Sequence, residues 1–75
     1  MSFDVVIQGQ GVFMIDPLSE RAKQWIEENI RGEQTWLHDM LACEGSRNTR
    51  AIVAGMVRDG LNVEVNGVDM KGFGQ

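Results

Sequence analysis

The sequence predicts a small α+β domain in two layers, with two helices on one face of a mixed sheet. Apolar residues alternate with polar ones near both ends of the chain, which is typical of half-buried strands. Two internal segments instead place apolar residues at helical spacing, and turn-forming residues separate the segments. Seventy-five residues suffice for one domain, residues 1–75. The predicted order is β-β-α-β-α-β-β.

Two strands are predicted at the N-terminus. Phe3, Val5 and Ile7 alternate with their neighbours, which indicates a strand with one buried face. The apolar run at residues 12–15 is typical of a central strand covered on both faces. Gly9 and Gly11 lie between the two, as a hairpin turn or a bulge. A phosphate-binding loop needs a lysine and a following helix, and these glycines have neither.

The first helix is predicted to start at Asp16-Pro17, with Asp16 as the capping residue and Pro17 in the first turn. Gly32 is the predicted stop, and Glu27 and Arg31 are spaced as a helical ion pair. The buried stripe is predicted to contain Leu18, Ala22, Trp25, Ile26 and Ile30.

The next segment, residues 33–39, is predicted to be a loop, followed by a buried strand at residues 40–43. Ser46 or Asn48 is expected to cap a second helix that ends at Gly60. Its apolar face contains Ile52, Val53, Met56 and Val57. Gly55 inside this helix implies a close approach to the sheet, because glycine costs about 1 kcal/mol there relative to alanine.

The C-terminal part predicts a hairpin. Residues 61–65 alternate as a strand with one wet face, and Asn66-Gly67 is a strong hairpin signal. Residues 68–70 are expected to return as an edge strand, and residues 71–75 are expected to fray as a flexible tail.

Charge and composition restrict the function. The net charge of −4 argues against general affinity for nucleic acid or anionic membranes. No signal-peptide pattern or run of about 18 apolar residues is present. With a single cysteine as well, we expect a cytoplasmic protein. So short a chain buries only about 60% of its unfolded surface, which favours a homodimer or a protein partner.

No constellation for catalysis, a cofactor or a metal is expected. Cys43 lies in an apolar strand, and His38 lies five residues before it in a polar segment. We expect a core cysteine and a loop histidine rather than a nucleophile and its base. One cysteine and one histidine cannot supply a four-ligand zinc site. Glu27 and Glu28 point in different directions on a helix. The sequence therefore predicts a protein that is not an enzyme.

Two groups of residues are candidates for interaction. Trp36 and Leu37 lie in the predicted loop, where the tryptophan either plugs the core or anchors a partner. Arg47, Arg50 and Arg58 lie on the second helix and either contact phosphates or form a solvated face that pairs with nearby acids. The leading interpretation is binding to another protein, and the alternative is a nucleic-acid-associated regulator.

A third interpretation is an accessory of a larger assembly. Self-association through open strands at residues 3–7 or 68–70 would support it.

Two stretches carry a resemblance. PLSERAKQWIEEN (residues 17–29) and AGMVRDGL (residues 54–61) resemble patterns in short proteins of bacteriophages and bacterial mobile elements. The resemblance covers about residues 11–65. It implies a small intracellular phage or prophage protein whose partner is a host factor or a defence component, and it carries over no functional residue.

Overall fold

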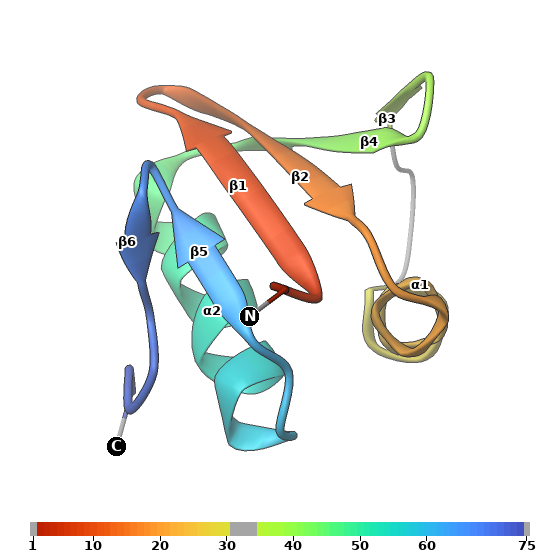
Figure 1. Cartoon of the computed structure of the whole chain (residues 1–75). Coiled ribbons are helices and arrows are strands. Elements are labelled where there is room, and N and C mark those ends of the chain that lie inside the picture. Colours follow the sequence, from red (N-terminus) through yellow and green to blue (C-terminus); the bar gives the residue numbers. More distant parts are fainter. Residues whose placement is uncertain (1, 31–34, 75) are drawn as a thin grey trace.

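A computed structural model describes residues 2–30 and 35–74 and has the predicted α+β architecture (Figure 1). The sheet has six strands in the order β3-β4-β2-β1-β5-β6. The β1–β5 pair is parallel, and the other pairs are antiparallel. The elements are β1 (Val5–Gly9), β2 (Val12–Pro17), α1 (Glu20–Asn29), β3 (Thr35–Leu37), β4 (Met40–Glu44), α2 (Ser46–Arg58), β5 (Val63–Val65) and β6 (Val68–Asp69).

The predicted order is confirmed, with one added strand. Residues 35–37 form β3, which pairs with β4, whereas the sequence predicted a loop here. The hairpin turn at His38-Asp39 requires a φ of 59° at His38, and no glycine marks it. The predicted turn at Asn66-Gly67 is confirmed, with positive φ at both residues.

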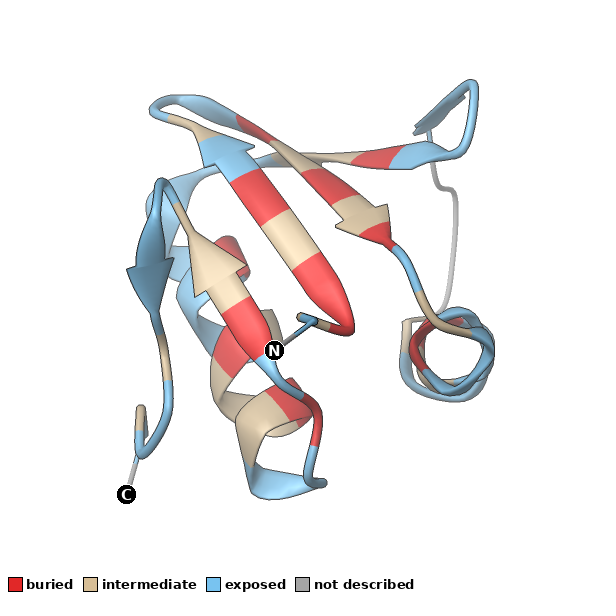
Figure 2. Ribbon diagram, in the orientation of Figure 1, coloured by how far each residue is buried: buried red, intermediate tan, exposed pale blue. Residues whose placement is uncertain are grey.

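The core lies between one face of the sheet and both helices. Burial alternates along β1 and β2 (Figure 2), as a sheet with one covered face requires. Ile7 and Ile15 face each other across the β1–β2 pair and are fully buried. The helices add Ala22 and Ile26 from α1 and Val53 and Met56 from α2 to the same cluster.

The opposite face of the sheet is not covered by either helix, which corrects the prediction for two strands. In β2, Val12 is exposed and Met14 is half-buried, although the run was predicted to be covered on both faces. In β4, Leu41 is the one buried residue, and Ala42 and Cys43 are half-buried. A continuous apolar run is compatible with two kinds of strand. Both faces can be buried, or one face can be buried while the other is apolar and exposed.

The prediction of an open strand at residues 3–7 is wrong for the part that forms β1. Residues 5–7 pair with β2 on one side and with β5 on the other. The outermost strands are β3 and β6, and β6 (Val68–Asp69) matches the other predicted edge.

The start of α1 differs from the prediction. Asp16 and Pro17 remain in β2, where they pair with Val6 and Val5. The helix begins at Glu20 because the hydroxyl of Ser19 accepts a hydrogen bond from the backbone N–H of Ala22 at 3.2 Å.

The predicted apolar stripe of α1 is only partly correct. Leu18 precedes the helix and is exposed. Ala22 and Ile26 are buried, and Trp25 and Ile30 pack against the core from the side. The helix ends at Asn29, with Ile30 as its cap. The predicted stop at Gly32 and the partner Arg31 of the predicted ion pair lie outside the described residues.

Helix α2 begins at Ser46, with Gly45 in the capping position and no side-chain cap. Neither predicted cap acts as one, and Asn48 instead donates to the carbonyl of Glu44 at 3.3 Å. The predicted end is confirmed. Gly60 has a φ of 90°, and the N–H of Leu61 reaches back to the carbonyl of Met56 at 3.0 Å, as in a Schellman motif.

Gly55 makes room for a side chain of α1 and not for the sheet, so the predicted close approach of α2 to the sheet is wrong. A Cβ atom at this position would lie 3.1 Å from Cζ2 of Trp25. The indole N–H of Trp25 donates to the Asp59 carboxylate at 2.8 Å. The tryptophan therefore lies across α2 and joins the two helices.

The C-terminal residues pack on the helix side of the sheet. Residues 71–74 form turns after β6. Phe73 is half-buried and packs against the core, and Gly74 lies close to Ala54 of α2.

A half-buried ion pair joins three parts of the chain. The carboxylate of Asp4 accepts bonds from Nε and Nη2 of Arg21 at 3.0 and 2.6 Å and from the backbone N–H of Asn62 at 2.9 Å. The hydrogen bonds from Arg21 hold the pKa of Asp4 well below its ordinary value, against the opposing effect of burial. Asp4 thus fastens the start of β1 to α1 and to the segment before β5.

Candidate functional site

The uncovered face of the sheet carries an apolar path that crosses three strands. By strand alternation, Leu37 and Met40 are paired on this face. Ala42 of β4 is paired with Met14 of β2, and Val12 follows on β2. Leu37 is 53% exposed, Met40 38% and Val12 51%, whereas Ala42 and Met14 are half-buried. We call these five residues the open apolar path.

Carboxylates lie on both sides of this path. Glu44 pairs with Val12 at one side. Asp16 and Glu64 lie at the other, both paired with Val6 of β1. The strand positions on this face include no lysine or arginine. The face therefore combines apolar side chains with negative charge alone.

A shallow hollow lies beside the path. It has a volume of about 100 Å³ and is lined by Val6, Gln8, Met14, Asp16 and Met40. Among the described residues, the Asp16 carboxylate has no hydrogen-bond or ion-pair partner.

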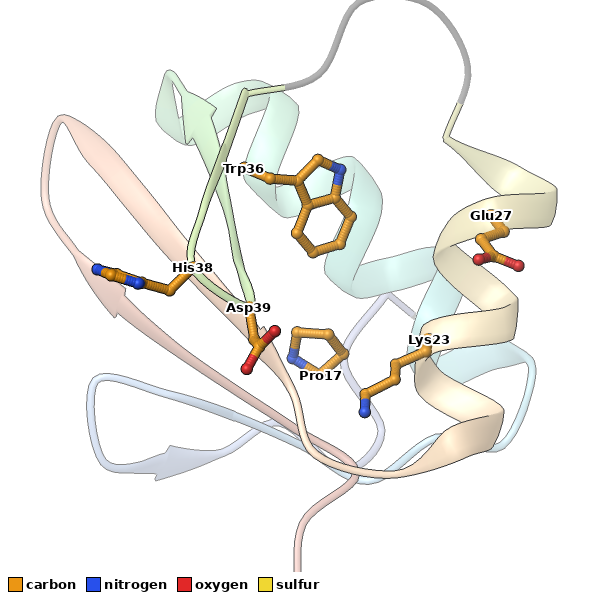
Figure 3. A pocket seen from close by; sticks show the side chains of 6 residues that line it. All are labelled: Pro17, Lys23, Glu27, Trp36, His38 and Asp39. Carbon is orange, nitrogen blue, oxygen red and sulfur yellow. The ribbon is translucent and has the colours of Figure 1, made fainter.

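A second, larger groove of about 210 Å³ separates the β3–β4 hairpin from α1 (Figure 3). Pro17 and Trp36 line it, and the indole points toward Pro17 and α1. Lys23 extends into the same space, while His38 points away from it. Its lining has one cation, Lys23, between the carboxylates of Glu27 and Asp39. The groove consequently has no uniform charge to select a partner.

The structure separates Trp36 from Leu37, although they are adjacent in the sequence. Successive residues of a strand point to opposite faces, so Trp36 lies on the helix side and Leu37 on the open face. Trp36 is 43% exposed. It neither plugs the core nor stands clear as an isolated anchor, because it lines the hairpin groove.

The three arginines of α2 form a separate surface. Arg47, Arg50 and Arg58 are all exposed. At 100° per residue they fall within about 80° of one another on the helix. Arg47 and Arg58 point away from the buried Val53 and Met56, whereas Arg50 lies beside Val53 and lines a small apolar hollow with it. Arg58 lies 3.7 Å from its neighbour Asp59, an exposed contact that contributes little stability. Arg47 and Arg50 form no ion pair with the rest of the described chain.

The lone thiol and the lone imidazole do not meet. His38 precedes β4, and Cys43 is the fourth residue of that strand, which at about 3.3 Å per residue places them ~10 Å or more apart. Cys43 is half-buried and accepts a hydrogen bond from the Thr49 hydroxyl at 3.4 Å. In residues 2–30 and 35–74, no three His, Cys, Asp or Glu side chains are grouped to hold a metal ion.

The glycine pair forms the predicted turn. Gly9 is the last residue of β1 and Gly11 immediately precedes β2, and a Cβ on Gly9 would collide with the carbonyl of Val12. The Asn66 side chain brackets Gly9: its carbonyl accepts from the Gly9 N–H at 3.0 Å, and its amide donates to the Gly9 carbonyl at 2.9 Å. The end of β1 is thus hydrogen-bonded to a side chain of the β5–β6 hairpin.

The predicted interaction residues therefore divide among three surfaces, and the sequence missed most of the open apolar path. Val12, Met14 and Met40 were assigned to buried strands. The sequence did contain a signal. Val12 and Met14 alternate along one strand, and Met40 and Ala42 alternate along another, so each pair lies on one face of its strand. The opposite face of each strand is also apolar.

Comparisons with protein-family models, with curated proteins and with solved structures give no match for this chain. Within the described residues, neither helix is long and apolar enough to cross a membrane.

Proposed function

We propose that this is a small, non-enzymatic, cytoplasmic protein that acts by binding another protein through the uncovered face of its sheet. The observation that carries the proposal is the open apolar path, in which the half-buried Met14 and Ala42 connect the exposed Leu37–Met40 pair to the exposed Val12. Contiguous apolar surface with a polar rim is typical of a protein-binding site.

The width of the open apolar path and the charges beside it also suit a protein partner. Strands lie about 4.8 Å apart, so a path across β3, β4 and β2 spans ~10 Å between the outer strands and more along them. The flanking carboxylates of Asp16, Glu44 and Glu64 form the polar rim. Following the resemblance of residues 17–29 to phage sequences, we further propose that the chain is a phage or prophage accessory factor and that its partner is a protein of the host.

A pull-down from bacterial lysate tests this function. Three tagged forms are compared: the wild type, Leu37→Ser with Met40→Ser, and Arg47→Ser with Arg50→Ser. The proposal expects a stoichiometric protein that survives nuclease treatment, is lost with the first double variant and is retained with the second. Far-UV circular dichroism of each form checks that it is folded. A partner retained by both double variants would contradict the proposal.

A second candidate function is supported by the position of the arginines. Arg47, Arg50 and Arg58 share one exposed side of α2, in the helix layer, away from the carboxylates of the open face. This separation of charge would allow an acidic chain to contact a phosphate backbone. It predicts bound material that disappears with nuclease, binding that weakens steeply with salt, and loss with the arginine variant rather than the Leu37–Met40 variant.

Self-association is distinguished in the same experiment. A homodimer formed through the outer strands β3 and β6 would appear as a doubled mass in light scattering, with no captured partner.

A further inference from the structure

We propose that the uncovered face binds a basic amphipathic helix of the partner and seats one lysine or arginine side chain of that helix in the hollow beside Asp16. This inference rests on the proposed function, because it names the chemistry of the protein bound at that face.

The hollow combines the two properties that such a side chain requires. Val6, Met14 and Met40 offer apolar contact for the methylene stem of a lysine or arginine. The carboxylate of Asp16, which has no protein partner among the described residues, offers a counter-ion for its charged end. An apolar side chain would fill the same volume but would cover this carboxylate without pairing it, at a desolvation cost.

The surrounding charges extend the same pattern. The open apolar path runs between Glu44 on one side and Asp16 and Glu64 on the other. An amphipathic helix with an apolar stripe between two rows of cations matches this order of apolar and acidic positions.

The charges also argue against two other occupants. A second copy of this face would bring like-charged carboxylates together around an apolar contact, which opposes binding. Nucleic acid is repelled by a face with carboxylates and no lysine or arginine on its strand positions. The helix layer, which carries the arginines, is the only described surface suited to phosphate.

Two synthetic 18-residue helices test the inference. Both have the same leucine stripe, and their polar positions are lysine in one and glutamate in the other. Each is titrated into the ¹⁵N-labelled full chain, and backbone amide shifts report the site and the Kd. We expect the leucine–lysine peptide to shift residues of β1, β2 and β4, with affinity that falls as salt is raised. We expect the leucine–glutamate peptide to leave them unchanged.

Matched charge variants make the test specific. Asp16→Asn should weaken the leucine–lysine peptide about fivefold, the effect of one partly exposed ion pair. Glu28→Gln removes the same charge from the exposed side of α1 and should leave the Kd within a factor of two. Met40→Ser should weaken binding as well, because the hollow loses one wall.

The results separate this inference from the function beneath it. Equal binding of both peptides, an unchanged Kd for Asp16→Asn, or shifts confined to α2 would each overturn the inference. A host protein still lost with the Leu37–Met40 variant would then leave the proposed function standing. Concentration-dependent shifts of the open face without any peptide would instead show a second copy as the occupant and overturn the inference.

Discussion

Replacing Asp4 by Asn should destabilise the fold by about 2 kcal/mol at pH 7. The carboxylate accepts two bonds from Arg21 and one from the Asn62 N–H. Asparagine has the same shape and retains one acceptor oxygen for Asn62, but its amide turns a donor toward the guanidinium. The substitution therefore removes the ion pair and leaves most of the packing in place.

The magnitude follows from the exposure of the two partners. A hydrogen bond to a charged group contributes about 1.5–3 kcal/mol. Asparagine loses the bond from Nε of Arg21, and the oxygen it keeps for Asn62 still accepts from Nη2 but carries no charge. The Arg21 side chain is 57% exposed, so water replaces much of what it loses, whereas the Asp4 side chain is 11% exposed. We therefore expect about 2 kcal/mol rather than twice that. A chain of this length has a total stability of about 4 to 11 kcal/mol, and the melting temperature should fall by roughly 8–16 °C.

The penalty should also depend on pH. In the unfolded chain Asp4 takes up a proton near its ordinary pKa of about 3.9, whereas the bonds from Arg21 hold the folded pKa well below this value. The stabilisation is thus fully present above about pH 5 and is lost as the pH falls toward the folded pKa. Asparagine does not titrate, so the difference between the two proteins should shrink below pH 4.

Urea unfolding followed by tryptophan fluorescence at pH 7 and pH 2.5 measures both effects. Asp39→Asn is the control, since Asp39 is exposed and forms no ion pair with the described residues. A loss of less than 0.5 kcal/mol at pH 7, or an equal loss at both pH values, would show that the Asp4–Arg21 ion pair does not stabilise the fold. The 0.5 kcal/mol limit is the usual range for surface substitutions.

Two further predictions concern the helices. Gly55→Val should destabilise the chain by about 2 kcal/mol, because the valine side chain displaces the Trp25 indole. Ala51→Val, at an exposed position of the same helix, controls for the cost of a β-branched residue in a helix. Equal melting temperatures for the two variants would contradict this prediction. Ser19→Ala should cost about 1 kcal/mol in urea unfolding through loss of the helix cap, while Asp16→Ala should change stability by less than 0.5 kcal/mol; the reverse ranking would show that α1 begins at Asp16.

Local patterns in the sequence predicted most of the architecture. Alternation identified β1 and β5, helical spacing identified both helices, and Asn66-Gly67 identified the last hairpin. These features depend on neighbours within a few residues, which is the range over which periodicity and turn chemistry act. The glycine pair between the first two strands was also predicted as a hairpin turn or a bulge, and the structure has the turn.

The start of α1 illustrates where such patterns mislead. Asp-Pro and Leu-Ser both precede the helix, and both fit the preferences of a helix start. Pairing with β1 determines where the helix begins. Because Val5 and Val6 pair with Pro17 and Asp16, strand β2 continues through Pro17 and the helix starts after it. That pairing is a contact between segments about ten residues apart, and local propensity does not contain it.

The candidate site was the least predictable feature, because it exists only where neither helix covers the sheet. Val12 and Met14 have the composition of core residues, and only the placement of both helices on the other face leaves them open. Similarly, the ion pair of Asp4 and Arg21 and the contact of Trp25 with Gly55 join distant segments. Their chemistry is ordinary, and the fold alone brings them together.

Methionine footprinting tests most directly whether this protein binds through its open face. Met14 and Met40 lie on that face, Met70 packs on the helix side, and Met56 is fully buried. The free chain and its complex with the captured partner are oxidised under identical mild conditions, and mass spectrometry reports each methionine. We expect the complex to protect Met40 and Met14 from oxidation and to leave the oxidation of Met70 unchanged. Unaltered oxidation of Met40 in a stoichiometric complex would contradict it.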